Sequence, residues 1–352
     1  MEFKQLIFRQ FVPLTFAFTS ALFLLGCAAT NAPGTTEKIE GVSIEGPSVP
    51  SDESLMTDII QIGAGAICLM PYGYMRAGES EVRHDQVEWQ WWGEREEGVR
   101  IMCQEAKANE LSVMIKPHLW IGRGEFTGSL SFKEASEQKN WNRSYGNYIL
   151  KYARLAEELD AELFCIGTEL CSQVADDQLF WSSLISDIRS VYRGQITYAA
   201  NWDCYSDFPF WSELDYIGVD AYFPITDTES EGDIDVVKAW DRWKPGLKAL
   251  SDSVDRPILF TEYGYRSCVG GLEKPWIGDQ ELEADQSTQF RGYQGLYASV
   301  WNEPWFAGGF LWKWHCKGHL EGDRSADYTP QNKPTLELIE SVYKGQSLKK
   351  VE

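Results

Sequence analysis

Two glutamates each follow an apolar run that has the character of a buried β-strand. Glu169 ends the segment FCIGTE, and Glu262 ends the segment PILFTE. A carboxylate buried without partners is very costly, so a chain rarely places one there by accident. Taken singly, either glutamate is more often a salt-bridged or helix-capping residue. Two carboxyls that face one another across a cavity are the groups that hydrolyse glycosidic bonds, and the pair favours that catalytic interpretation.

The other apolar runs also end on polar or aromatic side chains. We expect seven of these residues to contact the substrate: His118, Trp120, Asn201, Trp202, Asp220, Tyr222 and Trp312. A lone histidine at a strand end is equally compatible with a structural role. The concentration of such side chains at one end of the strands nevertheless predicts a functional face.

Short apolar runs alternate with segments of helical periodicity. The expected strands are Gly41–Gly46, Ala66–Pro71, Ser112–His118, Leu163–Glu169, Ile196–Trp202, Tyr216–Tyr222, Ile258–Glu262 and Gly309–Trp314. The expected helices between or after them are Glu97–Asn109, Lys133–Leu159, Gln178–Tyr192, Ile234–Leu250, Ala284–Trp301 and Leu336–Val342. Eight such strands predict an α/β protein with a single (β/α)₈ barrel domain, and a doubly wound open sheet is the alternative. In a barrel the carboxyl ends of the strands meet on one face, which would bring Glu169 and Glu262 together.

The composition excludes some classes of partner. The formal net charge is −21, which argues against a nucleic acid or an anionic membrane surface, because both require clustered Lys and Arg. Solubility alone also accounts for this acidity. The chain carries 15 Trp, 16 Tyr and 17 Phe, and rings with an apolar face and a polar edge suit sugars. A neutral polymer such as a glycan therefore fits as the ligand. We also expect a monomeric protein.

The N-terminal segment is expected to lie outside the fold. Lys4 and Arg9 precede an apolar run that ends LFLLGC at Cys27, which is the pattern of a secretory signal. The ending resembles a bacterial lipobox, which implies cleavage after residue 26 and a lipid on Cys27. We expect residues 1–26 to be the signal peptide, 27–40 the lipidated cysteine and tether, and 41–352 the catalytic domain. The protein would then be exported and held at the cell envelope only by this anchor, and Ala28 favours the outer membrane in a Gram-negative cell. An ordinary signal or an uncleaved anchor is the alternative.

Seven further cysteines follow Cys27, and an odd number cannot all form disulfides. Cys68 and Cys165 lie inside apolar runs and are expected to be small buried hydrophobic residues. The chain has no C-x-x-C motif and no His/Cys cluster, so we expect neither a metal nor another cofactor.

The order of the motifs GVSIEGP, KPHLW, IGTEL, DYIGVDAYFP, TEYGYRS and GGFLWKW resembles clan A of the glycoside hydrolases, and more narrowly glycoside hydrolase family 113. The resemblance covers roughly residues 41–314. It implies a (β/α)₈ enzyme that retains the anomeric configuration, and known members of the family are mainly β-mannanases. It further implies that Glu169 is the acid/base, that Glu262 is the nucleophile, that Tyr222 hydrogen-bonds Glu262, and that Trp312 is the floor under the sugar at the cleavage site.

The chain departs from the clan pattern at one position. Much of the clan has Asn directly before the acid/base, whereas this chain has Thr168, and Asn201 is a candidate to replace that Asn. The tryptophans of EWQWWGE, in the expected loop 71–96, are open to stacking on sugars or on the barrel's own helices. Glu303 of NEPWF falls before the last strand, at the wrong end of the barrel, and is read as structural. An endo-β-1,4-mannanase is favoured. Another clan A β-glycosidase, such as a glucanase or galactosidase, and a non-catalytic glycan-binding lipoprotein are the alternatives.

Overall fold

The computed structural model describes residues 38–50, 56–227, 234–278, 282–316 and 323–346. These residues belong to one compact unit, Thr36–Glu352. The expected signal peptide, the lipidation site Cys27 and most of the expected tether lie outside the described residues. β1 begins at Ile39, two residues before the start expected from the sequence.

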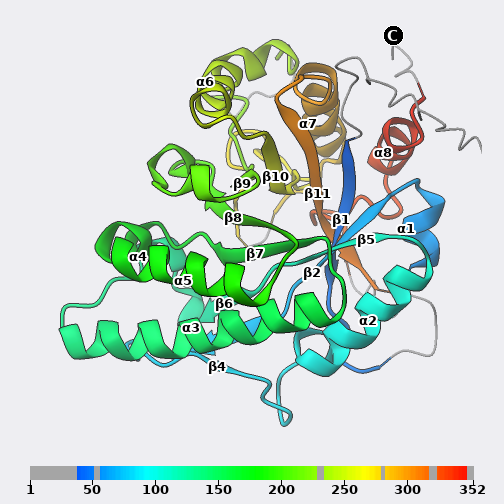
Figure 1. Cartoon of the computed structure of the whole chain (residues 1–352). Coiled ribbons are helices and arrows are strands. Elements are labelled where there is room, and N and C mark those ends of the chain that lie inside the picture. Colours follow the sequence, from blue (N-terminus) through cyan, green and yellow to red (C-terminus); the bar gives the residue numbers. More distant parts are fainter. Residues whose placement is uncertain (1–37, 51–55, 228–233, 279–281, 317–322, 347–352) are drawn as a thin grey trace, which may run out of the picture. The chain divides into compact units, whose positions relative to one another are not determined.

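Eight parallel strands form a closed barrel (Figure 1). In barrel order these are β1 (Ile39–Glu45), β11 (Phe306–His315), β10 (Ile258–Tyr263), β9 (Ile217–Asp220), β8 (Gln195–Asn201), β7 (Leu163–Thr168), β5 (Ser112–Ile115) and β2 (Ala66–Leu69). Every one of the eight expected strands is present. The (β/α)₈ architecture is therefore confirmed, and the open-sheet alternative is excluded.

The interior of the barrel is packed with apolar side chains. Cys68, Met114, Cys165 and Leu259 belong to this inner cluster, and all four are fully buried. The expectation that Cys68 and Cys165 act as buried hydrophobic residues is confirmed. A second and larger apolar cluster lies between the strands and the helices, so strands such as β7 and β10 are buried along their whole length. Burial on both faces explains why these strands read as continuous apolar runs.

Helices surround the barrel, as Figure 1 shows. They are α1 (Thr57–Gln61), α2 (Glu96–Ala108), α3 (Ala135–Glu158), α4 (Cys171–Asp176), α5 (Gln178–Val191), α6 (Lys244–Val254), α7 (Gln286–Ser299) and α8 (Thr335–Tyr343). Short 3₁₀ turns are η1 (Trp92–Glu94), η2 (Gly122–Gly124), η3 (Thr127–Ser129), η4 (Tyr205–Asp207), η5 (Trp211–Glu213) and η6 (Lys238–Arg242). In the described part of the chain, none of the helices has the length and apolar character needed to cross a bilayer.

The helix expected over 234–250 was too long. The chain forms the 3₁₀ turn η6 first and begins α6 only at Lys244. Pro245 lies in the first turn of α6, where its missing N–H has no intrahelical partner to lose. Two short helices, α1 and α4, were not expected from the sequence, because five or six residues carry too little periodicity to be recognised.

A second sheet projects from the barrel. It contains β3 (Tyr72–Met75), β4 (Arg83–His84) and β6 (His118–Ile121) in the order β4-β3-β6. β3 follows β2 and β6 follows β5, so the sheet starts at the carboxyl ends of two neighbouring barrel strands. The prediction that 71–96 is a loop was therefore wrong for its first part. Likewise, His118 lies in β6 and not at the end of a barrel strand.

Candidate active site

The two candidate catalytic glutamates come from the carboxyl ends of two strands that are not neighbours. Glu169 follows β7 directly, and Glu262 is the last residue but one of β10. β8 and β9 separate these strands in the barrel. All the strands are parallel, so both side chains belong to the same face of the barrel. They interact electrostatically, because the charge of Glu262 contributes to raising the pKa of Glu169.

Glu262 is held from both sides of its carboxylate. The Lys116 ammonium donates to Oε1 at 2.5 Å, and the Tyr222 hydroxyl donates to Oε2 at 2.6 Å. The Tyr222 bond is the one that the family resemblance implied. Only 5% of the Glu262 residue is exposed. Hydrogen bonds to both oxygens fix the plane of the carboxylate and favour its ionised form.

Lys116 is the important residue that the sequence did not reveal. It follows β5 at the centre of the barrel and is fully buried. Its ammonium also donates to Oδ1 of Asp220 at 2.8 Å, and the Thr261 hydroxyl donates to the same oxygen at 2.8 Å. Asp220 has no exposed surface, so its carboxylate is a second buried counter-charge to Lys116. One cation thus serves two buried carboxylates.

The charges of this group set the pKa of Glu262. Burial raises it most, the neighbouring Asp220 carboxylate raises it further, and Lys116 and Tyr222 oppose the rise. The resulting pKa of Glu262 is about 7. Burial alone would lower the pKa of Lys116, but the two carboxylates outweigh burial and raise it. The lysine therefore stays charged throughout the physiological range.

Glu169 has a different environment. Burial raises its pKa well above the ordinary value, and the negative charges of Asp220 and Glu262 add to the rise. Within the described residues it has no ion-pair partner, whereas Glu262 has Lys116. A protonated carboxyl next to one that ionises more readily is the arrangement that separates a proton donor from a nucleophile.

The backbone of Glu169 makes a sharp turn out of β7. Its φ angle is +51°, in the left-handed region, which costs a non-glycine residue roughly 1–3 kcal/mol. Two hydrogen bonds hold the turn: the Glu169 N–H donates to the Ala199 carbonyl at 2.8 Å, and the Leu170 N–H donates to the Tyr198 hydroxyl at 2.7 Å. Such strain is typical of positions where a side chain must point in a direction that a regular strand does not allow.

His118 and Trp312 lie beside Glu262. Their rings are stacked, with centroids 5.9 Å apart and planes 12° from parallel. The Nε2 atom of His118 lies 3.5 Å from Oε1 of Glu262, and among the described residues it has no hydrogen-bond partner. Burial, reinforced by the charge of Lys116, lowers the pKa of His118 well below its usual range. The imidazole is therefore neutral at pH 7, and its buried Nε2 faces Glu262.

The remaining residues that were expected to contact the substrate make no hydrogen bond with Glu262. Trp120 lies two residues after His118 in β6 and is 53% exposed. Trp202 stacks on Trp276 with centroids 5.0 Å apart. Asn201, at the end of β8, is partly exposed, and its side-chain oxygen accepts from the Trp202 N–H at 2.9 Å. The Thr168 hydroxyl donates to the Pro117 carbonyl at 3.4 Å, so it is directed at the backbone.

A model of Glycoside Hydrolase Family 113 matches residues 52–333. This range includes the end of β7, the end of β10, and Lys116 with its partner Asp220. The chain belongs to glycoside hydrolase family 113. No curated protein sequence matches this hydrolase.

Solved structures of three similar proteins share its fold. A GH113 β-mannanase from Alicyclobacillus acidocaldarius is 23% identical, with a TM-score of 0.78 over 88% of this chain and 97% of the other. A GH113 β-1,4-mannanase is 24% identical, with a TM-score of 0.74 over 88% of this chain and all of the other. A Faecalibacterium prausnitzii β-glucuronidase is 13% identical, with a TM-score of 0.56, and this chain matches 49% of it.

A disulfide between Cys171 and Cys204 lies close to Glu169 in this family 113 hydrolase. Cys171 begins α4, two residues after Glu169, and Cys204 lies three residues beyond the end of β8. The bond joins the segments that follow two neighbouring strands, so it restrains the turn that carries the candidate acid. The sequence could not have predicted which of the seven cysteines pair.

A network of charged side chains occupies the carboxyl ends of β1 and β11. Glu45 accepts from Lys313 at 2.6 Å and from Nδ1 of His315, whose Nε2 lies 3.2 Å from Asp327. Burial opposes ionisation of Glu45, but its bonds to His315 and Lys313 prevail and lower its pKa to about 2. These groups hold the last strand against the first one and close the barrel beside Trp312.

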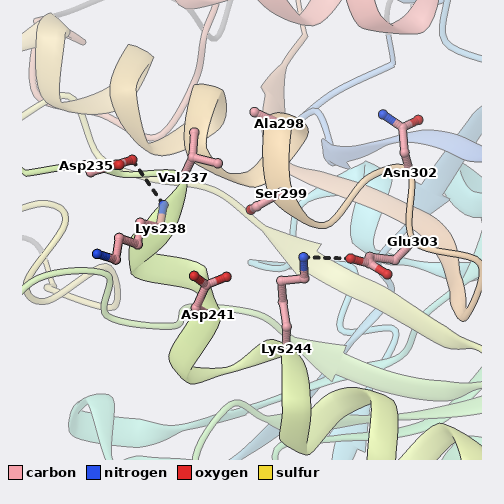
Figure 2. Close-up of a pocket in the computed structure, with 9 residues that line it drawn as sticks. All are labelled: Asp235, Val237, Lys238, Asp241, Lys244, Ala298, Ser299, Asn302 and Glu303. Carbon is pink, nitrogen blue, oxygen red and sulfur yellow. Dashed lines mark hydrogen bonds and ion pairs between the residues drawn. The ribbon is translucent and has the colours of Figure 1, made fainter.

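Figure 2 shows a pocket of about 510 Å³, and neither Glu169 nor Glu262 lines it. It is lined by η6, the start of α6, the end of α7 and the turn before β11. Glu303 in this pocket forms an ion pair with Lys244 at 2.6 Å, and it precedes β11, at the amino ends of the strands. The structural interpretation of Glu303 agrees with this pairing. Among the described residues, no group of three or more His, Cys, Asp or Glu side chains is arranged to hold a metal.

Replacing Lys116 tests how far its charge keeps Glu262 ionised. In Lys116→Met the cation is lost, so the pKa of Glu262 should rise, and ionised Glu262 should appear only at higher pH. We expect the acidic limb of the pH dependence of kcat/KM to move up by roughly 1–3 pH units. The measurement is a pH–rate profile on a soluble β-glycan.

Lys116→Arg is the matched control, because it keeps the charge and should shift the limb less than Lys116→Met. Thermal unfolding of both variants separates an electrostatic effect from a general loss of structure. An acidic limb that stays at the same pH in folded Lys116→Met would contradict the assigned role of Lys116.

Proposed function

We propose that this family 113 hydrolase is an endo-β-1,4-mannanase that cleaves its substrate with retention of anomeric configuration. The observation that carries the proposal is the contrast between the two glutamates. Glu262 is bonded to a cation and to a tyrosine hydroxyl, whereas Glu169 has no ion-pair partner among the described residues and a pKa raised well above the usual value. Glu262 is thus suited to attack the anomeric carbon, and Glu169 is suited to donate a proton.

In the first step ionised Glu262 attacks the anomeric carbon, and Glu169 gives its proton to the glycosidic oxygen. The bond to the leaving sugar breaks as the bond to the Glu262 oxygen forms. Glu262 is then neutral as an ester, and Glu169 is ionised. The hydrogen bond from Tyr222 orients Glu262 before attack, and Lys116 keeps the carboxylate charged until the bond forms.

In the second step a water molecule attacks the same carbon. Glu169 takes a proton from this water, and the bond to Glu262 breaks, which restores both side chains. Because each step inverts the anomeric carbon, the product keeps the configuration of the substrate. Glu169 must therefore change its charge twice in a cycle, which is easier for a carboxyl whose pKa is raised above its ordinary value.

The surrounding side chains are proposed to hold the sugar at the cleavage site. Trp312 provides an apolar face for a sugar ring, and the His118 ring, which is stacked against Trp312, supports it next to Glu262. Asn201 is the candidate for the sugar 2-hydroxyl, because Thr168 is bonded to a backbone carbonyl. Asp220 acts through Lys116 and does not itself contact the sugar, since it is fully buried.

Mannan is favoured as the substrate because two similar solved structures are named as mannanases of family 113. We further propose that the enzyme is exported and lipid-anchored through Cys27, with the tether ending where β1 begins. The Cys171–Cys204 disulfide supports export, because such bonds persist in oxidising compartments and are rare in the cytosol.

Substitution of each glutamate tests the catalytic pair. Glu169→Gln and Glu262→Gln keep the size of the side chain but remove the proton donor and the nucleophile. Each should lower kcat by at least ~10³-fold on a β-mannooligosaccharide. The measurement is the rate of formation of reducing ends, made on protein that melts at the wild-type temperature.

Glu303→Gln is the matched control, since Glu303 lies away from the pair, and it should retain wild-type kcat. Folded variants of Glu169 or Glu262 with full activity would refute the assignment. If the variants lose activity but the wild type gives products of inverted configuration, the catalytic pair stands and only the nucleophilic role of Glu262 is refuted.

Product analysis on a panel of β-glycans tests the substrate. The wild-type enzyme should release internal oligosaccharides from β-1,4-mannan faster than from β-glucan or xylan. Anomeric NMR spectra recorded early in the reaction should show the β form first. Preferential cleavage of glucan or of a galactoside would move the enzyme to another specificity of the clan, and binding without cleavage would favour a glycan-binding protein.

Replacement of Cys27 tests the anchor. In a bacterial host the full precursor should fractionate with membranes, whereas Cys27→Ser should be recovered in the soluble fraction or as uncleaved precursor. Thr30→Ala, close to the same site, should behave as the wild type. Wild-type protein found only in the soluble fraction would contradict lipidation, and mass spectrometry of the N-terminal peptide provides a direct check.

A further inference from the structure

The second sheet carries aromatic rings on one of its faces. β3 and β6 pair in parallel, with Tyr72 opposite His118 and Tyr74 opposite Trp120. Side chains two residues apart in a strand point to the same side. These four rings therefore share one face, and we call this face, together with Trp89, the aromatic sheet face.

The opposite side of the same sheet is anchored in the core. Met75, Leu119 and Ile121 alternate with the aromatic residues and are buried in the main apolar cluster. The Tyr148 hydroxyl lies 2.9 Å from the carbonyl oxygens of both Pro71 and His118 and shares its one proton between them, which ties both strands to α3 where they leave the barrel. The sheet is thus a fixed support and not a mobile loop.

The aromatic sheet face is continuous with the catalytic centre. The centroid of His118 lies 5.9 Å from that of Trp312 and 5.1 Å from that of Tyr72, and Tyr72 lies 6.2 Å from Tyr74. The Cα atom of Trp120 lies about 7 Å farther along β6 than that of His118, given the rise of a β-strand. The row of rings thus starts beside Glu262 and leads outward.

The segment EWQWWGE supplies the outer end of this row. Trp92 is buried in the core, but Trp89 is 53% exposed and meets the Tyr74 ring edge-on, with centroids 4.5 Å apart. Buried Gln90 donates to the carbonyls of Tyr72 and Glu94 and so holds the segment against β3. The Tyr74 hydroxyl donates to Glu94 at 2.5 Å, which fixes that ring too.

We propose that the aromatic sheet face binds successive sugar units of a β-linked glycan beyond the unit held at Glu262, with Trp120 and Trp89 as the outer contacts. The inference rests on the proposed function and extends it. Large apolar rings on a rigid face are unfavourable in water unless something covers them. A neutral glycan has apolar C–H faces that suit such rings, and its chain must pass this face if it lies in the site beside His118.

Trp89→Ala and Trp120→Ala test the proposal through the dependence on substrate length. The measured quantity is the ratio of kcat/KM for a long oligosaccharide to that for the shortest one cleaved. Each substitution should lower this ratio about tenfold, the effect of losing roughly one aromatic contact. Phe126→Ala is the matched control: Phe126 is 50% exposed, but it lines a cavity with Met75 and Ile121, whose side chains leave the other side of the sheet.

Calorimetric binding of the same oligosaccharides to Glu169→Gln separates this inference from the proposed function. If the wild type cleaves no β-glycan, the proposed function fails, yet weaker binding of long oligosaccharides after Trp89→Ala in that background would still support the sheet face. If cleavage is observed but the ratio and the length-dependent affinity stay at wild-type values in both tryptophan variants, the aromatic sheet face does not bind the chain.

Discussion

One buried ammonium contacts two buried carboxylates, and the rest of the proposed catalytic centre depends on this contact. Lys116 lies between Asp220 and Glu262, and it cannot neutralise both. The group as a whole is therefore negative by one charge when all three side chains are ionised. Burial is the main reason why the pKa of Glu262 lies near 7 in spite of two hydrogen bonds, and the charge of Asp220 adds to it. Burial likewise raises the pKa of Glu169, and the charges of Asp220 and Glu262 raise it further. Removing Lys116 would leave two uncompensated carboxylates in the interior, which is costly.

The closed barrel is what brings these three residues together. Lys116 is 104 residues from Asp220 and 146 residues from Glu262 in the chain, yet they meet because β5, β9 and β10 run in parallel and end on one face. The inner barrel core, which includes Cys68 and Cys165, lies around the same axis. An open sheet would not bring the ends of β5 and β10 so close, since three strands lie between them on one side.

Much of this arrangement could be predicted from the sequence, because buried parallel strands leave a strong apolar signal. The eight strands and the positions of Glu169 and Glu262 at their ends were predicted correctly. Lys116 was not recognised although it lies inside the expected strand Ser112–His118, because nothing local indicates a partner more than 100 residues away. β3 and β6 were missed for another reason. They have four residues each, and alternating aromatic side chains in so short a segment are equally typical of a loop. Pairing of the cysteines depends on spatial proximity, which spacing does not reveal.

The two sides of the catalytic centre are made rigid by different means. On the Glu169 side the turn has a left-handed φ, and its cost is offset by bonds to Ala199 and Tyr198 and by the Cys171–Cys204 disulfide. On the His118 side, rigidity comes from the small second sheet, which has one face buried in the core and contains no covalent cross-link. Rigid support lowers the entropy lost when a long and flexible glycan is bound, because only the ligand has to be ordered. A barrel with mobile loops in both places would have to order itself as well. This difference in entropy favours the proposal that the second sheet is part of the glycan-binding surface.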